Sequence, residues 1–193
     1  MSEPGRLWLI RHGDTEWTAT GRHTSHTDVP LTATGREQAV LLGGLLGGRQ
    51  FSIVLSSPMS RAIETCRLAG YGDVVAVDDG LKEWDYGDYE GRTTVEIREE
   101  NPGWTIWAGA PNSESLDQVG ARARRVIERA SEAGGDAALF SHGHFLRVLG
   151  ATWVGLSPEA GRFLSLGTAA LSILGYERET RVIRQWNRVS GLG

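Results

Sequence analysis

The sequence predicts a three-layer α/β/α domain with a mainly parallel central sheet. Two observations favour this fold class: short apolar runs alternate with capped or amphipathic segments, and glycine- or proline-containing turns separate the two. The 193 residues, 40% of them hydrophobic, suffice to bury one core, and no shift in composition marks a boundary. We therefore expect a single domain over residues 1–193.

Short apolar runs give the expected strands. Their length and their flanking turn residues are typical of strands rather than of helices, and the runs at residues 7–10 and 51–55 are expected to be buried. A terminal hairpin is expected after the last helix, over residues 169–176 and 180–186. The four strands expected before it cover residues 7–10, 51–55, 74–77 and 136–140.

Capping signals mark the helices between these runs. Thr32 is expected to cap a helix whose leucines recur at helical spacing until Gly47 and Gly48 end it. Pro58 suits the first turn of a second helix that runs toward Gly70. Further helices are expected over residues 93–100, 115–132 and 145–153.

Composition excludes several classes of partner. The net charge of -4 gives no general attraction for nucleic acid or for an anionic membrane, so we expect neither. The apolar run at residues 7–10 is too short for a secretory signal or a membrane span, which favours a cytoplasmic protein. Cys66 is the only cysteine, and its helical setting indicates a structural thiol. The terminal hairpin offers an edge strand through which a homodimer could form.

Polar side chains follow each of the four expected strands. In open α/β sheets, the carboxyl ends of the strands meet at one crevice, where ligands bind. Residues far apart in sequence should therefore share one pocket with two arginines, two histidines and one carboxylate. The candidates are Arg11 and His12 after the first strand, Arg61 after the second, Glu83 after the third, and His142 with Gly143 after the fourth.

This set of residue types suits a phosphoryl group. The guanidinium groups of Arg11 and Arg61 pair with phosphate oxygens and neutralise a dianion without a metal or another cofactor. Catalysis of phosphoryl transfer depends mainly on positioning and electrostatic stabilisation, to which His142 and the backbone N–H of Gly143 can contribute. The same positive charges disfavour protonation of His12, which keeps its imidazole nucleophilic.

A leaving alkoxide needs a proton, and the loop over residues 78–91 offers candidate donors. Glu83 beside Trp84 can donate this proton and then activate the water that hydrolyses a phosphohistidine. Asp85 and Glu90 lie on the same loop, and the residue types alone leave the choice among the three carboxylates open.

Five motifs in order resemble those of the phosphoglycerate-mutase-like histidine phosphatases, branch 1 of their superfamily. Leu-Ile-Arg-His-Gly-Asp-Thr-Glu-Trp at residues 9–17 resembles the family signature. The resemblance covers residues 7 to about 150 and implies the family's fold. The other motifs lie within residues 21–39, 56–65, 81–91 and 141–143.

The resemblance also assigns roles by position. It implies that His12 becomes phosphorylated and that no metal takes part. It further implies that Glu83 is the proton donor, and that the phosphate is held by Arg11, Arg61 and His142. Thr18, Thr24 and Ser25 stand where the family usually has an asparagine and a glutamine-glycine pair, and we expect them to contact the substrate.

Two reactions remain open within the family. Its mutases carry a long insertion with basic residues after the acid/base loop, whereas the stretch after Arg92 is short here and Thr94 replaces the usual lysine. The sequence therefore favours a phosphatase for small phosphorylated metabolites, which most resembles the small bacterial acid phosphatases of broad specificity. A 2,3-bisphosphoglycerate-dependent phosphoglycerate mutase is the alternative.

The residues also bear on two other classes of protein. His142 and His144 resemble a His-x-His metal pair, but a metallohydrolase needs a further cluster of ligands, and none is evident. A non-catalytic phosphate-binding module would be expected to lack His12 or Glu83, and the chain has both.

Two interpretations remain open for several side chains. His144 either lines the pocket and selects substrates or packs at a helix N-terminus. Trp84, Trp104 and Trp107 form either an apolar wall for the leaving group or ordinary packing. His23 and His26 are expected at the surface or at the pocket rim.

Overall fold

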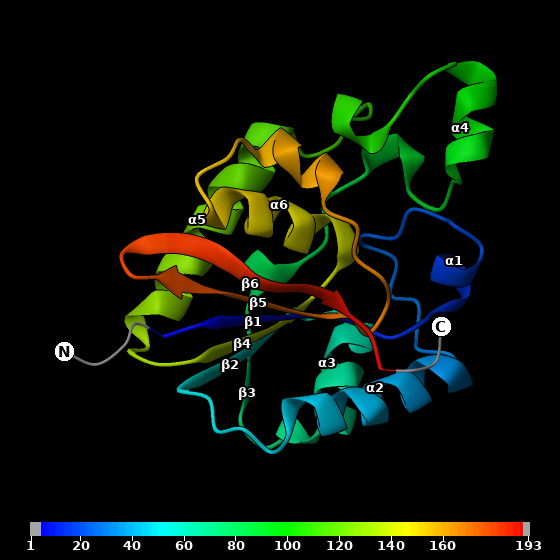
Figure 1. The fold of residues 1–193 in the computed structure, drawn as a ribbon. Helices are drawn as coiled ribbons and strands as arrows, with labels where there is room; N and C mark the ends of the chain where they lie inside the picture. Colours follow the sequence, from blue (N-terminus) through cyan, green and yellow to red (C-terminus); the bar gives the residue numbers. More distant parts are fainter. Residues whose placement is uncertain (1–4, 191–193) are drawn as a thin grey trace.

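The computed structural model describes residues 5–190, and a six-stranded sheet forms its centre (Figure 1). The strand order is β3-β2-β4-β1-β5-β6, and β5 pairs antiparallel with both of its neighbours, while all other pairs are parallel. This arrangement confirms the predicted fold class. The strands are β1 (Leu7–Arg11), β2 (Ile53–Ser56), β3 (Val75–Val77), β4 (Ala137–Ser141), β5 (Leu171–Glu177) and β6 (Thr180–Arg188).

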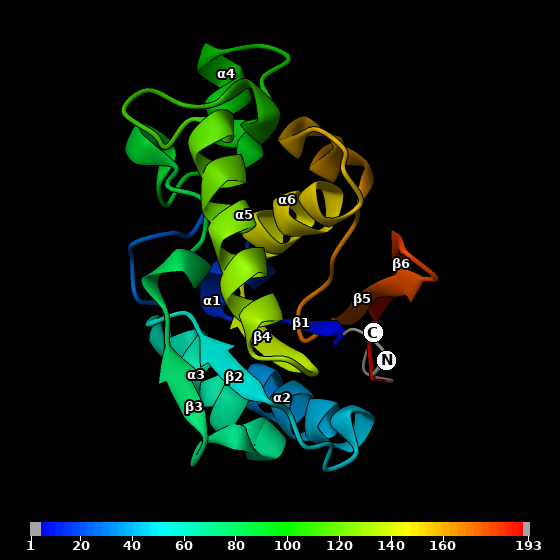
Figure 2. The ribbon, with the colours of Figure 1, turned by 90° about the vertical axis from the view of Figure 1, so that its left-hand side faces the viewer.

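Helices cover both faces of the sheet, as the two views at right angles show (Figures 1 and 2). One face carries α2 (Ala33–Leu46) and α3 (Ser60–Cys66), and the other carries α5 (Leu116–Glu132) and α6 (Gly143–Trp153). The central strands are therefore buried on both sides and contain apolar residues in succession. Two short helices, α1 (Glu16–Ala19) and α4 (Thr94–Glu100), lie in the connections at the end of the sheet to which β1 and β4 point.

Shorter helical turns connect these elements. A π-helical turn follows α3 directly, and its Gly70 adopts a φ of 94°, which favours glycine. The turns cover Arg67–Tyr71, Asp79–Leu81, Gly87–Tyr89, Ile106–Ala108 and Pro158–Phe163.

Local capping explains where the best-predicted helix begins and ends. The Thr32 hydroxyl accepts a hydrogen bond from the backbone N–H of Gly35, and Gly47 ends α2 with a φ of 61°. The prediction for α3 was wrong in one detail, because Pro58 lies before the helix rather than in its first turn. The carboxylate of Asp28 accepts from the N–H and hydroxyl of Ser60, so a distant loop caps this helix.

The sheet register places the predicted motifs side by side. Arg11 pairs with Ser141 across β1 and β4, and Ser56 pairs with Phe140 across β2 and β4. The three strands therefore end together, and the residues that follow them meet at one edge. None of the described helices is both long and apolar enough to cross a membrane. The single-domain assignment over 1–193 stays a prediction, and its first four and last three residues lie outside the described chain.

Cys66 is fully buried at the end of α3, and burial raises the pKa of its thiol to about 12. We expect the native protein to react with a disulfide reagent at about pH 8 on the order of 10³-fold more slowly than the protein unfolded in guanidinium chloride, because the thiolate is the reactive form. The absorbance of the thiol that the reagent releases measures the labelling rates of the native and the unfolded protein. Fast, stoichiometric labelling of the native chain would contradict a structural thiol.

Candidate active site

His12 directly follows β1, and its imidazole is held in one orientation. Its backbone N–H donates to the carbonyl of Ser141 at the end of β4 (3.0 Å), and its side chain is buried. Nδ1 lies 2.8 Å from the Gly13 carbonyl oxygen. Because a carbonyl only accepts, Nδ1 carries the hydrogen and Nε2 carries the lone pair.

Gly13 permits the backbone to approach α2 closely at this point. A Cβ atom on residue 13 would lie 2.3 Å from the carbonyl oxygen of Gly35, which is too close for any side chain. The backbone N–H of Gly13 also donates to the Thr65 hydroxyl on α3 (3.1 Å). The residue after His12 is therefore glycine for a packing reason, and this packing fixes the loop that carries the histidine.

The electrostatic environment keeps His12 neutral. Burial lowers the pKa of His12 well below its ordinary value, and the positive charges of Arg61 and Arg11 lower it further. The His142 ring lies with its centroid 5.1 Å from that of His12, and the same causes lower its pKa. At neutral pH, the Nε2 lone pair of His12 is therefore available.

Three buried nitrogen atoms in the predicted site have no hydrogen-bond partner within the described chain: Arg11 Nε, Arg61 Nε and His142 Nδ1. His142 Nε2 lies 2.8 Å from the Ser57 hydroxyl, which leaves Nδ1 as its unused atom. Unpartnered buried polar atoms are costly, so their presence around one residue indicates a site that a polar ligand completes.

Arg61 is fully buried, and a loop rather than a carboxylate holds most of its guanidinium. Nη1 donates to the Thr27 carbonyl (3.0 Å) and Nη2 to the Ser25 carbonyl (3.1 Å). The loop is fixed in turn by Glu90, whose carboxylate accepts from the backbone N–H groups of Ser25 and Thr27. Glu90 therefore positions the loop that orients Arg61.

Glu83 lies at the N-terminus of α6, where three backbone N–H groups hold its carboxylate. Oε1 accepts from Trp84 (2.9 Å) and from Phe145 (2.7 Å), and Oε2 accepts from His144 (3.1 Å). The side chain is only 7% exposed but still lines the pocket. Asp85 does not line the pocket, and its Oδ1 accepts from the backbone N–H of Gly87. The geometry thus separates Glu83 from both alternative carboxylates.

A cavity of about 180 Å³ opens over these groups. Of four further predicted residues, three line this cavity: Thr18, Thr24 and Gly143. The fourth, Ser25, is buried and is not part of the lining. Arg61 and His142 are fully buried next to these groups and are not among the lining residues. The full lining comprises Arg11, His12, Thr18, Gly21, Arg22, His23, Thr24, Glu83, Tyr86, Gly143, His144, Arg147 and Leu166.

Sequence reasoning did not assign five residues of this lining to the site: Gly21, Arg22, Tyr86, Arg147 and Leu166. The carbonyl of Leu166 accepts from Arg11 Nη1 (2.5 Å), a contact that no local pattern indicates. Arg147 had a usable signal, because it follows His144 by three residues and so shares a face of α6.

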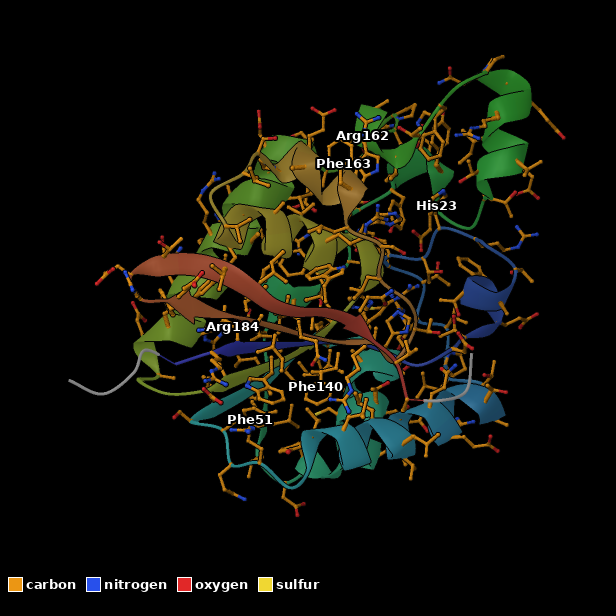
Figure 3. All side chains as sticks on the ribbon, viewed as in Figure 1. His23, Phe51, Phe140, Arg162, Phe163 and Arg184 are labelled. Atoms are coloured by element: carbon orange, nitrogen blue, oxygen red, sulfur yellow. The ribbon has the colours of Figure 1, made fainter. Side chains whose placement is uncertain are left out.

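Both predicted settings of His144 are present, because it lies at the N-terminus of α6 and packs against Tyr86 and Trp107 while it also lines the pocket; its selection of substrates stays a prediction. His144 lines the pocket, and its Nδ1 lies 2.7 Å from the Tyr86 hydroxyl oxygen. The tryptophans do not line this cavity. Trp84 is fully buried with its indole N–H on the Glu114 carbonyl, and Trp107 packs against it edge to face. His23 lines the pocket from the loop after α1 (Figure 3).

The buried histidines predict how stability depends on pH. Burial lowers the pKa values of His12, His23, His142 and His144 below the ordinary value of 6.5. The unfolded chain then binds more protons below pH 6.5, so stability is full above this value and falls as pH drops, by up to about 1.4 kcal/mol per pH unit for each histidine. Urea unfolding between about pH 7.5 and about pH 5 tests this, because most carboxylates titrate lower. An unchanged free energy of unfolding would contradict it.

Within residues 5–190, no group of three or more histidine, cysteine, aspartate or glutamate side chains is placed to hold a metal ion. The metallohydrolase interpretation therefore gains no support from this geometry. Independence from metals stays a prediction.

A model of the histidine phosphatase superfamily, branch 1, matches residues 7–189. The chain belongs to this superfamily. The prediction made from five ordered motifs is thereby confirmed, and membership implies a phosphorylated small molecule as substrate.

Relatives of this histidine phosphatase include enzymes from bacteria and yeast. An acid phosphatase of Mycobacterium tuberculosis is 45% identical over 181 residues, which cover 91% of this chain and 89% of the relative. A sedoheptulose 1,7-bisphosphatase of Saccharomyces cerevisiae is 37% identical over 188 residues, covering 80% of this chain and 69% of the relative. The solved structure of a Mycobacterium tuberculosis open reading frame product aligns with a TM-score of 0.92 and 42% identity, over 97% of this chain and 99% of that one.

Proposed function

We propose that the chain is a phosphatase that hydrolyses small phosphate monoesters through a covalent phosphohistidine on His12. One observation carries this proposal: three buried nitrogens without partners, on Arg11, Arg61 and His142, surround an imidazole whose Nε2 lone pair is free. A phosphoryl group supplies the acceptor oxygens that these nitrogens lack.

In the first step, His12 Nε2 attacks phosphorus and the bond from phosphorus to the ester oxygen breaks. Arg11 and Arg61 stabilise the charge on the phosphoryl oxygens, and the Gly143 backbone at the start of α6 adds a positive dipole. The carboxyl of Glu83 donates its proton to the leaving alkoxide, so that an alcohol departs.

In the second step, water attacks the phosphohistidine. Glu83, now a carboxylate beside the phosphoryl group, accepts a proton from this water. The bond from Nε2 to phosphorus breaks, and its electron pair returns to the imidazole of His12. Orthophosphate leaves, and both side chains regain their starting protonation states.

The residues after the acid/base loop favour hydrolysis over a mutase reaction. Thr94 begins α4, and its hydroxyl contacts His23 Nε2 (3.3 Å) instead of offering a charge to a substrate. A mutase must retain a bisphosphorylated intermediate and exclude water, which demands more substrate contacts than hydrolysis does. The phosphatase names of the two relatives support the same choice.

A substrate panel in excess chelator tests the proposal. It compares p-nitrophenyl phosphate, sugar phosphates, phosphoserine and 3-phosphoglycerate, with and without a 2,3-bisphosphoglycerate primer. We expect phosphate release that needs neither metal nor primer. Primer-dependent isomerisation of 3-phosphoglycerate that exceeds hydrolysis would favour the mutase, and complete loss of activity in chelator would contradict the metal-free mechanism.

A further inference from the structure

The first two turns of α6 present side chains to the pocket that the proposed phosphoryl transfer does not use. His144 and Arg147 are three residues apart on one face of the helix, and both line the cavity that contains His12 and Glu83. The backbone N–H of His144 donates to Glu83, the proposed proton donor to the leaving group. This part of the pocket therefore lies on the leaving-group side.

Arg147 is held rigidly, but not by a carboxylate. Its Nε donates to the Gly161 carbonyl (3.1 Å) and its Nη2 to the Arg162 carbonyl (3.3 Å). The guanidinium carbon lies 4.9 Å from the centroid of the Trp107 ring. Carbonyls and an aromatic face orient a cation without neutralising it. Among residues 5–190, no aspartate or glutamate forms an ion pair with Arg147, and its Nη1 has no hydrogen-bond partner.

The charges around the cavity exceed what one phosphate needs. Arg11 and Arg61 suffice for the dianion at His12. The charge of Arg22 is shared with Glu96, 3.7 Å away. Burial lowers the pKa of Arg147 and the nearby carboxylate of Glu83 raises it, but the two groups form no ion pair within residues 5–190. Arg147 therefore remains as a positive charge at the pocket without an ion-pair partner. An anionic group of a ligand would be its natural partner.

The helix sets the spacing between the backbone positions of Gly143 and Arg147 along the pocket. Residue 147 lies four residues beyond Gly143, which corresponds to a rise of about 6 Å along α6. Because His12 and Arg147 line one cavity of about 180 Å³, an anion at Arg147 and a phosphate at His12 can belong to one small molecule.

We infer that Arg147 determines specificity by binding a second anionic group, a carboxylate or a second phosphate, on the leaving group of a small phosphomonoester. This inference rests on the proposed function, since it places the scissile phosphate at His12. The competing explanation is structural: Arg147 would only fasten the segment Pro158–Phe163 to α6 through its two carbonyl contacts.

Matched substrate pairs separate the two explanations and the two sources of charge. Glycerol 3-phosphate against 3-phosphoglycerate adds a carboxylate, and fructose 6-phosphate against fructose 1,6-bisphosphate adds a phosphate. We expect kcat/KM of the wild-type protein to favour the charged member of at least one pair by about tenfold, because a fixed guanidinium contributes a charge-assisted hydrogen bond to it.

Arg147→Gln should reduce this preference to about twofold or less, since the amide keeps polarity but not charge. Arg147→Lys, a milder change, should give an intermediate ratio. Arg162→Gln is the matched control: it removes an arginine of the same segment that pairs with Glu159 and lies near Phe163 in Figure 3, outside the cavity lining. We expect the control to keep the wild-type ratio.

A wild-type protein without preference in either pair overturns the inference, as does an unchanged ratio in a folded variant at position 147. Equal loss for both members of a pair would show that the structural explanation is right. Failure to hydrolyse even p-nitrophenyl phosphate would instead refute the proposed function, so the two failures are distinguishable.

Discussion

Replacing His12 with alanine is expected to lower kcat by a factor on the order of 10⁴ or more, because the nucleophile of a covalent mechanism has no substitute nearby. His142 lies beside it but is oriented by Ser57 and has no role as an acceptor of the phosphoryl group in the proposed mechanism. The measurement combines steady-state hydrolysis of p-nitrophenyl phosphate with rapid quenching after addition of a radiolabelled ester. Wild-type protein should carry acid-labile label on His12, and the variant should carry none.

His26→Ala is the matched control for this experiment. His26 lies in the same loop region, but its side chain is 65% exposed and contacts Asp85 rather than the pocket. The control should keep activity and label. Thermal unfolding of both variants separates lost chemistry from lost structure. Label that persists in a folded His12→Ala variant, or activity close to that of the wild type, would refute the phosphohistidine mechanism.

Glu83→Gln should reduce kcat/KM for alkyl phosphates by about 10² to 10⁴, which is the usual contribution of a positioned general acid. The loss for p-nitrophenyl phosphate should be much smaller, since nitrophenolate departs without a proton. kcat/KM is the proper quantity because it reports the phosphorylation step. Loss of the same group as a base should slow the second step, so the phosphohistidine should accumulate with p-nitrophenyl phosphate, whose first step is little affected.

Asp85→Asn provides the comparison for this second variant. Asp85 lies on the same loop, yet it does not line the pocket. In the Asp85→Asn variant, kcat/KM should depend on the leaving group as it does in the wild type. If Glu83→Gln affects both kinds of substrate equally, or if Asp85→Asn reproduces its selective loss, the proton donor is a residue other than Glu83.

The local signals in the sequence were sufficient for most of the fold. α2 begins after Thr32 and ends at Gly47 as predicted, because both caps act within one turn of the helix. The start of α3 was misplaced because Asp28, more than thirty residues away, caps it at Ser60. Helix boundaries set by neighbouring residues are readable from sequence, whereas those set by a distant loop are not.

The candidate site shows the same difference between features set by neighbouring residues and features set by distant loops. The five proposed catalytic groups follow strand ends, and a parallel sheet brings such positions to one edge whatever the loops do. Ser25 was expected to contact substrate; it is buried and not part of the cavity lining, and its carbonyl accepts from Arg61, so the substrate contact stays a prediction. Which side chain fills a pocket and which supports it depends on how loops pack, and no motif carries that information.

The sequence by itself determined the superfamily, the layered fold and the set of residues that converge at the carboxyl edge of the sheet. It could do so because short motifs and alternating apolar runs specify strands, caps and their order locally. Only the tertiary structure decided which nitrogen of His12 is free, what orients Arg61, and that Arg147 lines the cavity without an ion-pair partner among the described residues. These features arise from hydrogen bonds and burial between segments distant in sequence, and such contacts exist only once the chain has folded.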